Sequence, residues 1–220
     1  MDAGTDIVVT GAVRGGDTSH APVVTRTAAA EARRIALAGD TQGDAKRRLR
    51  SSAEYDEIPR FDVLDIHVSA ASMTTALDQI ERWIERRERR YVCVSDVNGV
   101  VTAHADPDLR GVYNRSGMTL PDGVPLVWSG RRAGFRDMTR VCGPDLMPAL
   151  LSLAAERGWS SYFYGGAPGV AERLVENFDA QIVGLLVAGV ASPPYRPLSA
   201  EETAAAIAAI NDSGADIVWV

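Results

Sequence analysis

The sequence predicts an α/β fold with a mainly parallel sheet flanked by helices. Over residues 61–220, short apolar runs typical of buried strands alternate with longer segments of helical periodicity. Residues 1–60 differ, because they are rich in small and charged residues and contain few large apolar side chains. Such a segment cannot bury enough apolar surface to offset its chain entropy. We therefore predict a flexible N-terminal extension at 1–60, with a short helical pattern around Thr27–Leu37, and a folded domain at 61–220.

The first elements of the predicted domain are set by their apolar periodicity. FDVLDIHVS (61–69) alternates apolar and polar residues, which predicts a strand, and residues 72–90 carry apolar side chains at three- and four-residue spacing, which predicts an amphipathic helix. That helix ends in four arginines interleaved with Glu85 and Glu88, which favours a solvated helix end over a membrane-binding surface. There follow a buried strand at 91–96, one or two helices in 98–116, a short strand at 117–122 and a helix at 124–132.

The second half continues the alternation of helix and strand. A helix at 143–158 is closed by Gly158, and a helix at 167–178 places Pro168 in its first turn. Ser199 is the expected N-cap of a helix at 198–214. Strands are predicted at 161–166, 181–189 and 215–220. Because the last of these runs is not followed by a turn or cap, we expect the chain to be a piece of a longer protein.

Composition and charge exclude several classes of protein. The net charge of -6 argues against a nucleic-acid partner, which would favour a basic face. The sequence has neither an apolar run long enough to cross a bilayer nor a signal peptide, which predicts a cytoplasmic protein. Cys93 and Cys142 lack metal spacing and are expected to be reduced thiols, and three scattered histidines do not suggest zinc.

Three motifs could form a site. In PDGVPLVW (121–128), Asp122 lies between a strand and a helix, where it could act as a general base or simply cap the helix. In TRVCGPDL (139–146), Arg140 could bind a diphosphate or pair with a nearby acid. In YGGAPGVAERL (164–174), Gly165 and Gly166 could expose backbone N–H groups to an anion or merely form a tight turn. The DPD sequence at 106–108 resembles a metal-binding motif, but a helix cap is favoured.

These motifs, taken in this order and followed by SPPYRPLS (192–199), resemble the WecG/TagA/CpsF glycosyltransferase family over residues 61–220. The resemblance implies a Rossmann-like fold and an inverting transfer, without metal or cofactor, of an N-acetylmannosamine-type or glucose-type sugar. It implies a UDP-sugar donor and a polyprenyl-diphosphate-linked saccharide acceptor in cell-surface polysaccharide synthesis. It also implies peripheral attachment to the cytoplasmic face of the membrane in the full-length protein, and it leaves a homo-oligomer open.

The resemblance also assigns residues to roles. Asp122 of the DG pair, with Gly123 beside it, matches the base that deprotonates the acceptor hydroxyl, and Arg140 matches a binder of the donor diphosphate. Gly165 and Gly166 match a glycine pair near the nucleotide.

The sequence departs from the family pattern at two places. The positions of a T-x-N contact are Val94 and Asp96 here, so Asp96 and the nearby Asn98 are its candidate replacements. A glycine-rich loop and a C-terminal membrane-attachment segment that follow in the family do not occur in these 220 residues.

Two other functions remain alternatives. The first is a non-catalytic nucleotide-binding or scaffolding domain derived from this fold, which would bind UDP without turning over a UDP-sugar. The second is another sugar-nucleotide enzyme, such as an epimerase or dehydrogenase. The sequence lacks the GxGxxG and Y-x-x-x-K patterns of the usual NAD-dependent enzymes, which argues against this second alternative.

Overall fold

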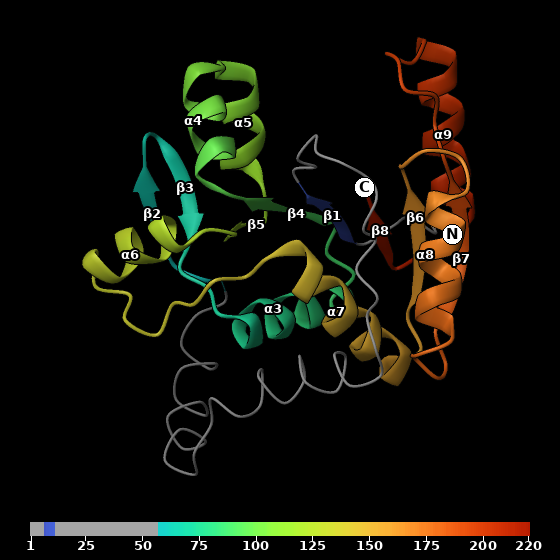
Figure 1. The fold of residues 1–220 in the computed structure, drawn as a ribbon, viewed down its shortest axis with the longest axis horizontal. Coiled ribbons are helices and arrows are strands. Elements are labelled where there is room, and N and C mark those ends of the chain that lie inside the picture. The colour runs from blue at the N-terminus through green and yellow to red at the C-terminus, as the bar shows by residue number, and fades with distance from the viewer. Residues whose placement is uncertain (1–6, 12–56) are drawn as a thin grey trace.

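A six-stranded sheet lies at the centre of the structure, a computed structural model that describes residues 7–11 and 57–220 (Figure 1). The strand order is β5-β4-β1-β8-β6-β7, and every neighbouring pair is parallel. The predicted α/β class with a parallel sheet is therefore confirmed. The strands are β1 (Ile7–Gly11), β4 (Arg90–Ser95), β5 (Met118–Pro121), β6 (Ser160–Tyr164), β7 (Leu186–Ala191) and β8 (Ile217–Trp219).

The helices cover both faces of this sheet. On one face, α3 (Met73–Glu85), α7 (Gly143–Arg157) and α8 (Val170–Asp179) enclose the largest core, which includes Ile80, Leu150 and Phe163. On the other face, α4 (Val97–Ala105), α5 (Pro107–Arg115) and α6 (Val124–Arg132) lie over the β4–β5 end and α9 (Ala200–Asp212) over the β6–β8 end. The expected helices at 72–90, 124–132, 143–158 and 198–214 are thus present, although the first ends at Glu85 and Arg90 already belongs to β4, and the 98–116 segment forms two.

The helix ends follow the predicted capping chemistry. The Ser199 side chain accepts a hydrogen bond from the Glu202 backbone N–H, and the Glu202 side chain accepts one from the Ser199 N–H, which together form a capping box. Asp106 caps α5 through hydrogen bonds from the N–H groups of Asp108 and Leu109, so the DPD sequence is a helix cap. Gly158 ends α7 in the left-handed conformation, with φ of 72°.

The N-terminal segment departs from the prediction at one place. Ile7–Gly11 forms β1, which pairs with both β4 and β8 in the middle of the sheet. Its sequence IVVTG is short and apolar enough for a buried parallel strand. The surrounding residues are mostly small or charged, so the composition of 1–60 as a whole does not indicate a strand. The helical pattern at Thr27–Leu37 lies outside the described residues, and the division at residue 60 remains a prediction.

Two element boundaries also differ. The helix expected at 167 begins at Val170, because Gly165, Gly166 and Gly169 adopt φ of 133°, 74° and 84° and hold the preceding segment, including Pro168, in a loop. The strand expected at 181–189 is β7, Leu186–Ala191, because residues 181–185 form the turn after α8.

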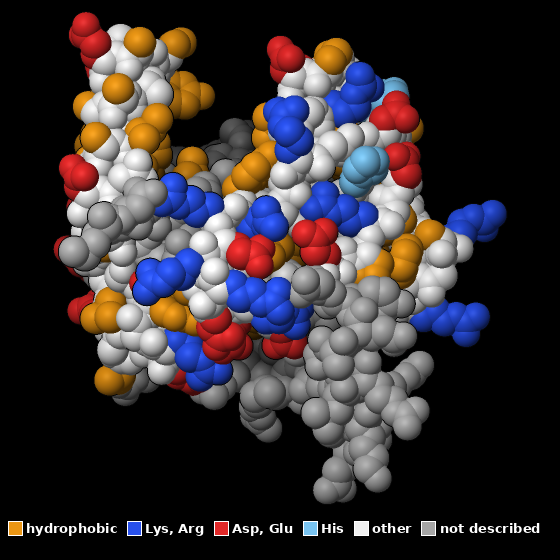
Figure 2. Space-filling view, turned by 180° about the vertical axis from the view of Figure 1, so that it is seen from behind, with side chains coloured by type: hydrophobic (Ala, Val, Ile, Leu, Met, Phe, Trp, Pro, Cys, Tyr) orange, Lys and Arg blue, Asp and Glu red, His pale blue; other side chains and the backbone are white. Residues whose placement is uncertain are grey.

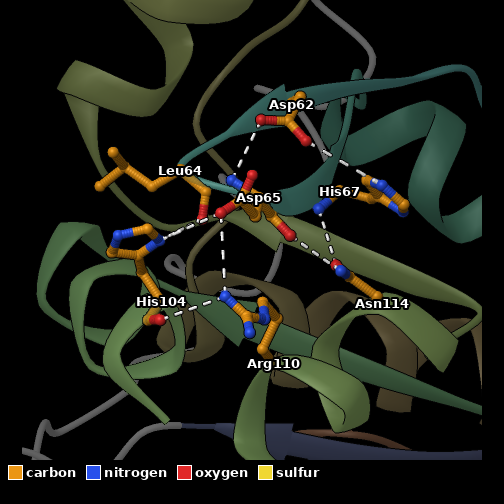
Figure 3. A network of polar contacts seen from close by, with 7 residues as sticks. All are labelled: Asp62, Leu64, Asp65, His67, His104, Arg110 and Asn114. Atoms are coloured by element: carbon orange, nitrogen blue, oxygen red, sulfur yellow. Dashed lines mark hydrogen bonds and ion pairs between the residues drawn. The ribbon is translucent and has the colours of Figure 1, made fainter. Parts of the chain in front are cut away.

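The segment expected to be one strand at 61–69 is a hairpin of β2 (Arg60–Val63) and β3 (Ile66–Ser69). Its turn places Leu64 and Asp65 at φ of 53° and 62°, a conformation that costs L-residues roughly 1–2 kcal/mol each. Side chains from α4 and α5 hold the turn (Figure 3): Asn114 donates to the Asp65 carbonyl at 2.8 Å, and His104 Nδ1 lies 3.0 Å from the Leu64 carbonyl. Arg110 pairs with the Asp65 carboxylate at 3.8 Å. The hairpin is therefore fixed to the α4–α5 pair.

Candidate functional site

The candidate site lies at the carboxyl ends of the strands, the edge where open α/β sheets bind ligands. Asp122 directly follows β5, and its N–H donates to the Ser95 carbonyl at the end of β4 at 2.8 Å. The two strand ends are therefore joined side by side. Figure 2 shows a hollow between two projections of the surface, which correspond to α4–α5 and α9 in Figure 1. Both projections extend from the carboxyl edge of the sheet.

Asp122 and Arg140, predicted separately from two motifs, form an ion pair. Arg140 donates from Nη2 and Nε to Asp122 Oδ1 at 2.9 and 3.1 Å. The arginine is brought there because the Val141 N–H donates to the Pro121 carbonyl at 2.9 Å and the Thr139 N–H to the Ala71 carbonyl at 3.1 Å. Within the described part of the chain, Asp122 Oδ2 and Arg140 Nη1 take part in no hydrogen bond, so each side chain keeps a polar atom for a ligand.

Exposure makes this pair weak as a structural bond. The side chains of Asp122 and Arg140 are 26% and 52% exposed. An exposed ion pair contributes roughly 0–1 kcal/mol to stability. Two opposite charges held at the ligand-binding edge, with little gain in stability, are more informative about binding and catalysis than about folding.

Two neighbours influence the electrostatics of Arg140. The pKa of Arg140 is raised above its usual value by the charge of the Cys142 sulfur, which acts only once that thiol has ionised, and by the hydrogen bond to Asp122. Burial raises the pKa of the Cys142 thiol to about 11, helped by its hydrogen bond to Asp145 at 2.8 Å. Because the thiol is therefore uncharged at neutral pH, Asp122 is the anionic partner that matters for Arg140. Both cysteines are buried free thiols, as predicted.

The predicted residues near the end of β4 lie beside Asp122. Asp96 caps α4, accepting a hydrogen bond from the Gly99 N–H at 2.9 Å, and the exposed Asn98 occupies the first turn of that helix. Gly123 is the N-cap residue of α6, and a Cβ on it would lie 3.9 Å from both the Asp96 Cα and the Val97 Cγ2. Two helix N-termini thus begin side by side next to Arg140. The positive end of each helix dipole favours an anion at this place.

The glycine pair occupies another part of the same edge. Gly165 follows β6 and donates its N–H to the Ala191 carbonyl at the end of β7 at 2.8 Å. Strands β4, β1 and β8 lie between β5 and β6, so four interstrand steps separate Gly165 from Asp122, about 19 Å. A Cβ on Gly165 would meet no atom within 4 Å, so a side chain would not clash here. Glycine is required because the backbone of Gly165 has a positive φ. The structure therefore places the glycines at the same edge as Asp122 and Arg140 but not in contact with them.

A supporting group below the site was not recognised in the sequence. Ser95 is fully buried, and a Cβ on Gly99 would lie 2.5 Å from Ser95 Oγ and 3.0 Å from the Tyr113 hydroxyl. Burial raises the pKa of Tyr113, and the hydrogen bond with Ser95 opposes this rise. Gly99 thus allows α4 to approach the end of β4 and α5 closely, which fixes Asp96. The sequence feature that could have indicated this close approach is the Asn98-Gly99 pair, which follows shortly after the buried strand β4.

The fold and the site define a Rossmann-like α/β domain that carries a carboxylate, a guanidinium and glycine-rich backbone along one ligand-binding edge. Comparison with known proteins gives the family. The model of the glycosyl transferase WecG/TagA/CpsF family matches residues 61–220, and the chain belongs to this family.

Two relatives match 120 residues of the chain. The chain is 23% identical over 120 residues to the N-acetylglucosaminyldiphosphoundecaprenol N-acetyl-beta-D-mannosaminyltransferase of Bacillus subtilis (strain 168), covering 54% of this chain and 47% of the relative. It is 24% identical, with the same coverage, to the protein of that name from Bacillus spizizenii (strain ATCC 23059 / NRRL B-14472 / W23). The aligned part thus spans about half the length of these relatives.

Among residues 7–11 and 57–220, no helix combines the length and apolar character that crossing a membrane requires. In the same residues, no three His, Cys, Asp or Glu side chains are grouped so as to hold a metal ion.

Proposed function

We propose that this chain provides the catalytic domain of an inverting glycosyltransferase. The donor is a UDP-sugar of the N-acetylmannosamine or glucose type, and the acceptor is a polyprenyl-diphosphate-linked saccharide in cell-surface polysaccharide synthesis. Membership of the family and the relatives' printed names support the transfer and the lipid-linked acceptor. The proposed setting is the cytoplasmic face of the membrane, with peripheral attachment and homo-oligomer formation as further expectations.

The observation that carries this proposal is the pairing of Asp122 with Arg140 at the ends of β4 and β5. Inverting transfer by one displacement needs a base at the attacking hydroxyl and stabilisation of the departing diphosphate. Asp122 Oδ2 accepts the acceptor's hydroxyl proton while the acceptor oxygen bonds to the anomeric carbon. The bond from that carbon to the diphosphate oxygen breaks, and its electron pair leaves with UDP. Arg140 then offers Nη1 to the diphosphate while its other nitrogens orient Asp122.

The glycine turn has a separate role in this proposal. Gly165 and Gly166 lie at the same edge, about 19 Å from Asp122 by strand count, so they do not contact the reacting atoms. They are suited to the distal part of the donor or to the polar part of an extended acceptor, through backbone N–H groups. Asp96, Asn98 and Gly123 line the near end beside the sugar.

The decisive test replaces Asp122 by asparagine in the full-length protein and follows sugar transfer to a lipid-linked acceptor. We expect the transfer rate to fall by roughly 10²–10⁴-fold, the usual contribution of a general base. The melting temperature should change little because the ion pair is exposed. Asp179→Asn, an exposed aspartate at the end of α8, is the control and should retain full activity.

Measuring UDP binding separately distinguishes the alternatives. Unchanged turnover in Asp122→Asn would show that Asp122 is not the base. UDP binding by the wild-type protein without any turnover of UDP-sugars would instead favour a non-catalytic nucleotide-binding domain. Arg140→Ala should weaken UDP binding, whereas Asp122→Asn should not.

A further inference from the structure

An apolar and basic strip crosses the surface directly beside Asp122. On α6, Val124 and Trp128 are 49% and 66% exposed, and on α4, Val97 and Val101 are 40% and 48% exposed. Each pair is separated by four residues and therefore lies on one side of its helix. The pairs meet at the site, because Val97 Cγ2 lies 3.9 Å from where a Gly123 Cβ would be.

Basic side chains continue the strip beyond Trp128. Arg131 and Arg132 follow Val124 by seven and eight residues, which places them on the same exposed side of α6. Arg136 is exposed in the loop after the helix, and Asp137 is the acid beside it. Figure 2 shows basic side chains protruding at the edge of the molecule where α6 lies in Figure 1. Among the described residues, Arg132 and Arg136 have no ion-pair partner.

The buried side of α6 explains why these residues face outward. Leu126, Val127 and Gly130 are buried, and Gly130 lies against Phe61 and Met138. The α6 side that carries Trp128 is therefore not needed for the core. A tryptophan that is 66% exposed has no packing role to explain it.

We propose that this strip, formed by Val97, Val101, Val124, Trp128, Arg131, Arg132 and Arg136, docks on an anionic lipid surface. Tryptophan beside arginine is the composition of interfacial helices, in which the indole enters the headgroup region and the cations meet anionic lipids. The strip deepens the proposed function, and rests on its lipid-linked acceptor and its peripheral attachment, by naming the surface that docks and the charge of the lipid. Docking in this orientation brings Asp122 and Arg140 to the membrane surface, where the acceptor's diphosphate lies.

Vesicle binding tests the proposal without any turnover. The full chain is sedimented with vesicles of phosphatidylcholine containing phosphatidylglycerol, and with vesicles of phosphatidylcholine alone. We expect binding to the anionic vesicles, weakened about 25-fold by the double variant R132Q/R136Q, since each arginine contributes roughly fivefold. W128A should weaken it roughly tenfold, because its large apolar surface is lost. The controls R173E, on α8, and Y195A, a fully exposed tyrosine, should bind as wild type.

Trp128 also serves as a built-in probe. Of the four tryptophans, Trp83 and Trp219 are 3% and 4% exposed and Trp159 is partly buried against the main core, so a vesicle-induced blue shift of emission and protection from acrylamide would report chiefly on Trp128. The shift should be absent in W128A. Equal vesicle binding by wild type, W128A and R132Q/R136Q would overturn the proposal, as would equal binding to vesicles without anionic lipid. Self-association in the absence of lipid that W128A abolishes would make the strip an interface between copies instead.

The proposed chemistry at Asp122 and the docking strip fail independently. Asp122→Asn should bind anionic vesicles as wild type whatever its transfer rate. Loss of vesicle binding in W128A together with unchanged transfer to a detergent-dispersed acceptor would support the docking strip. It would also show that Trp128 takes no part in the transfer step assigned to Asp122.

Discussion

Gly130 in α6 is the position where one added methyl group should have the clearest effect on stability. A Cβ there would lie 2.9 Å from both Cε1 and Cζ of Phe61 and even closer to the Met138 sulfur. Phe61 and Met138 are 9% and 1% exposed, so neither can turn into solvent. Overpacking costs about 1–3 kcal/mol, and the upper part of this range applies because two buried side chains must move at once; replacing glycine by alanine in a helix gains roughly 0.8–1 kcal/mol.

We therefore expect Gly130→Ala to destabilise the protein by about 1–2 kcal/mol. At this chain length each kcal/mol corresponds to roughly 2–4 °C, so the melting temperature should fall by about 2–8 °C. Gly143→Ala is the matched control, because a Cβ at the first residue of α7 meets no atom within 4 Å and no positive φ is required. Calorimetry and urea unfolding would measure both variants.

A double-mutant cycle makes the reasoning refutable. Met138→Ala alone should cost about 2–5 kcal/mol as a cavity mutation. Combined with Gly130→Ala it should cost less than the sum of the two, because the methyl group enters the space that Met138 vacates. An unchanged or raised melting temperature in Gly130→Ala would show that α6 does not pack as described. Strict additivity in the double variant would show that the Met138 contact is not the cause.

Two further predictions concern pH. The pKa of Cys142 is about 11, above its ordinary value of 9.0, so stability from the buried thiol is complete below pH 9 and is lost between pH 9 and 11. Wild type should lose about 2 kcal/mol more than Cys142→Ala over that interval in urea unfolding, and a parallel loss in both would refute the assignment. The pKa of Glu202 is about 2, below its ordinary value of 4.5, because Arg196 and the Ser199 N–H bind its carboxylate. Its stabilisation of α9 is complete above pH 4.5 and is lost as the pH falls through 2. Glu202→Gln should therefore flatten the acid dependence of amide exchange in α9, and an unchanged dependence would contradict this.

The parallel sheet and most of its helices could be predicted because each element satisfies a local rule. The α3 pattern of Ala76, Ile80 and Trp83 gives the buried side directly, and Ser199 with Glu202 gives the start of α9. The hairpin turn was missed because Leu64 is not one of the Gly, Asn or Asp residues that normally begin such a turn, and Asp65 alone does not mark it. Contacts from α4 and α5 impose that conformation, and these are remote in sequence.

The individual residues of the site could be predicted, but not which of them lie together in the structure. Asp122 and Arg140 could each be identified from a loop between a strand and a helix, but their pairing depends on the Val141–Pro121 and Thr139–Ala71 backbone bonds. The distance to Gly165 depends on strand order, which puts β4, β1 and β8 between the two parts. Strand order cannot be derived from local periodicity, because all these strands satisfy the same apolar pattern.

The central place of β1 has a consequence for how the chain folds. Ile7 is paired with Ile217, a sequence separation of 217 − 7 = 210 residues. Closing a loop of this size carries a large entropic cost before any contact compensates it, and such distant pairings slow folding. Without β1, the sheet would consist of a β5–β4 pair and a separate β8–β6–β7 unit, each with an open edge. During synthesis the halves that carry Asp122 and the glycine turn can each form early, but their alignment into one ligand-binding edge must await one of the most distant pairings in the chain.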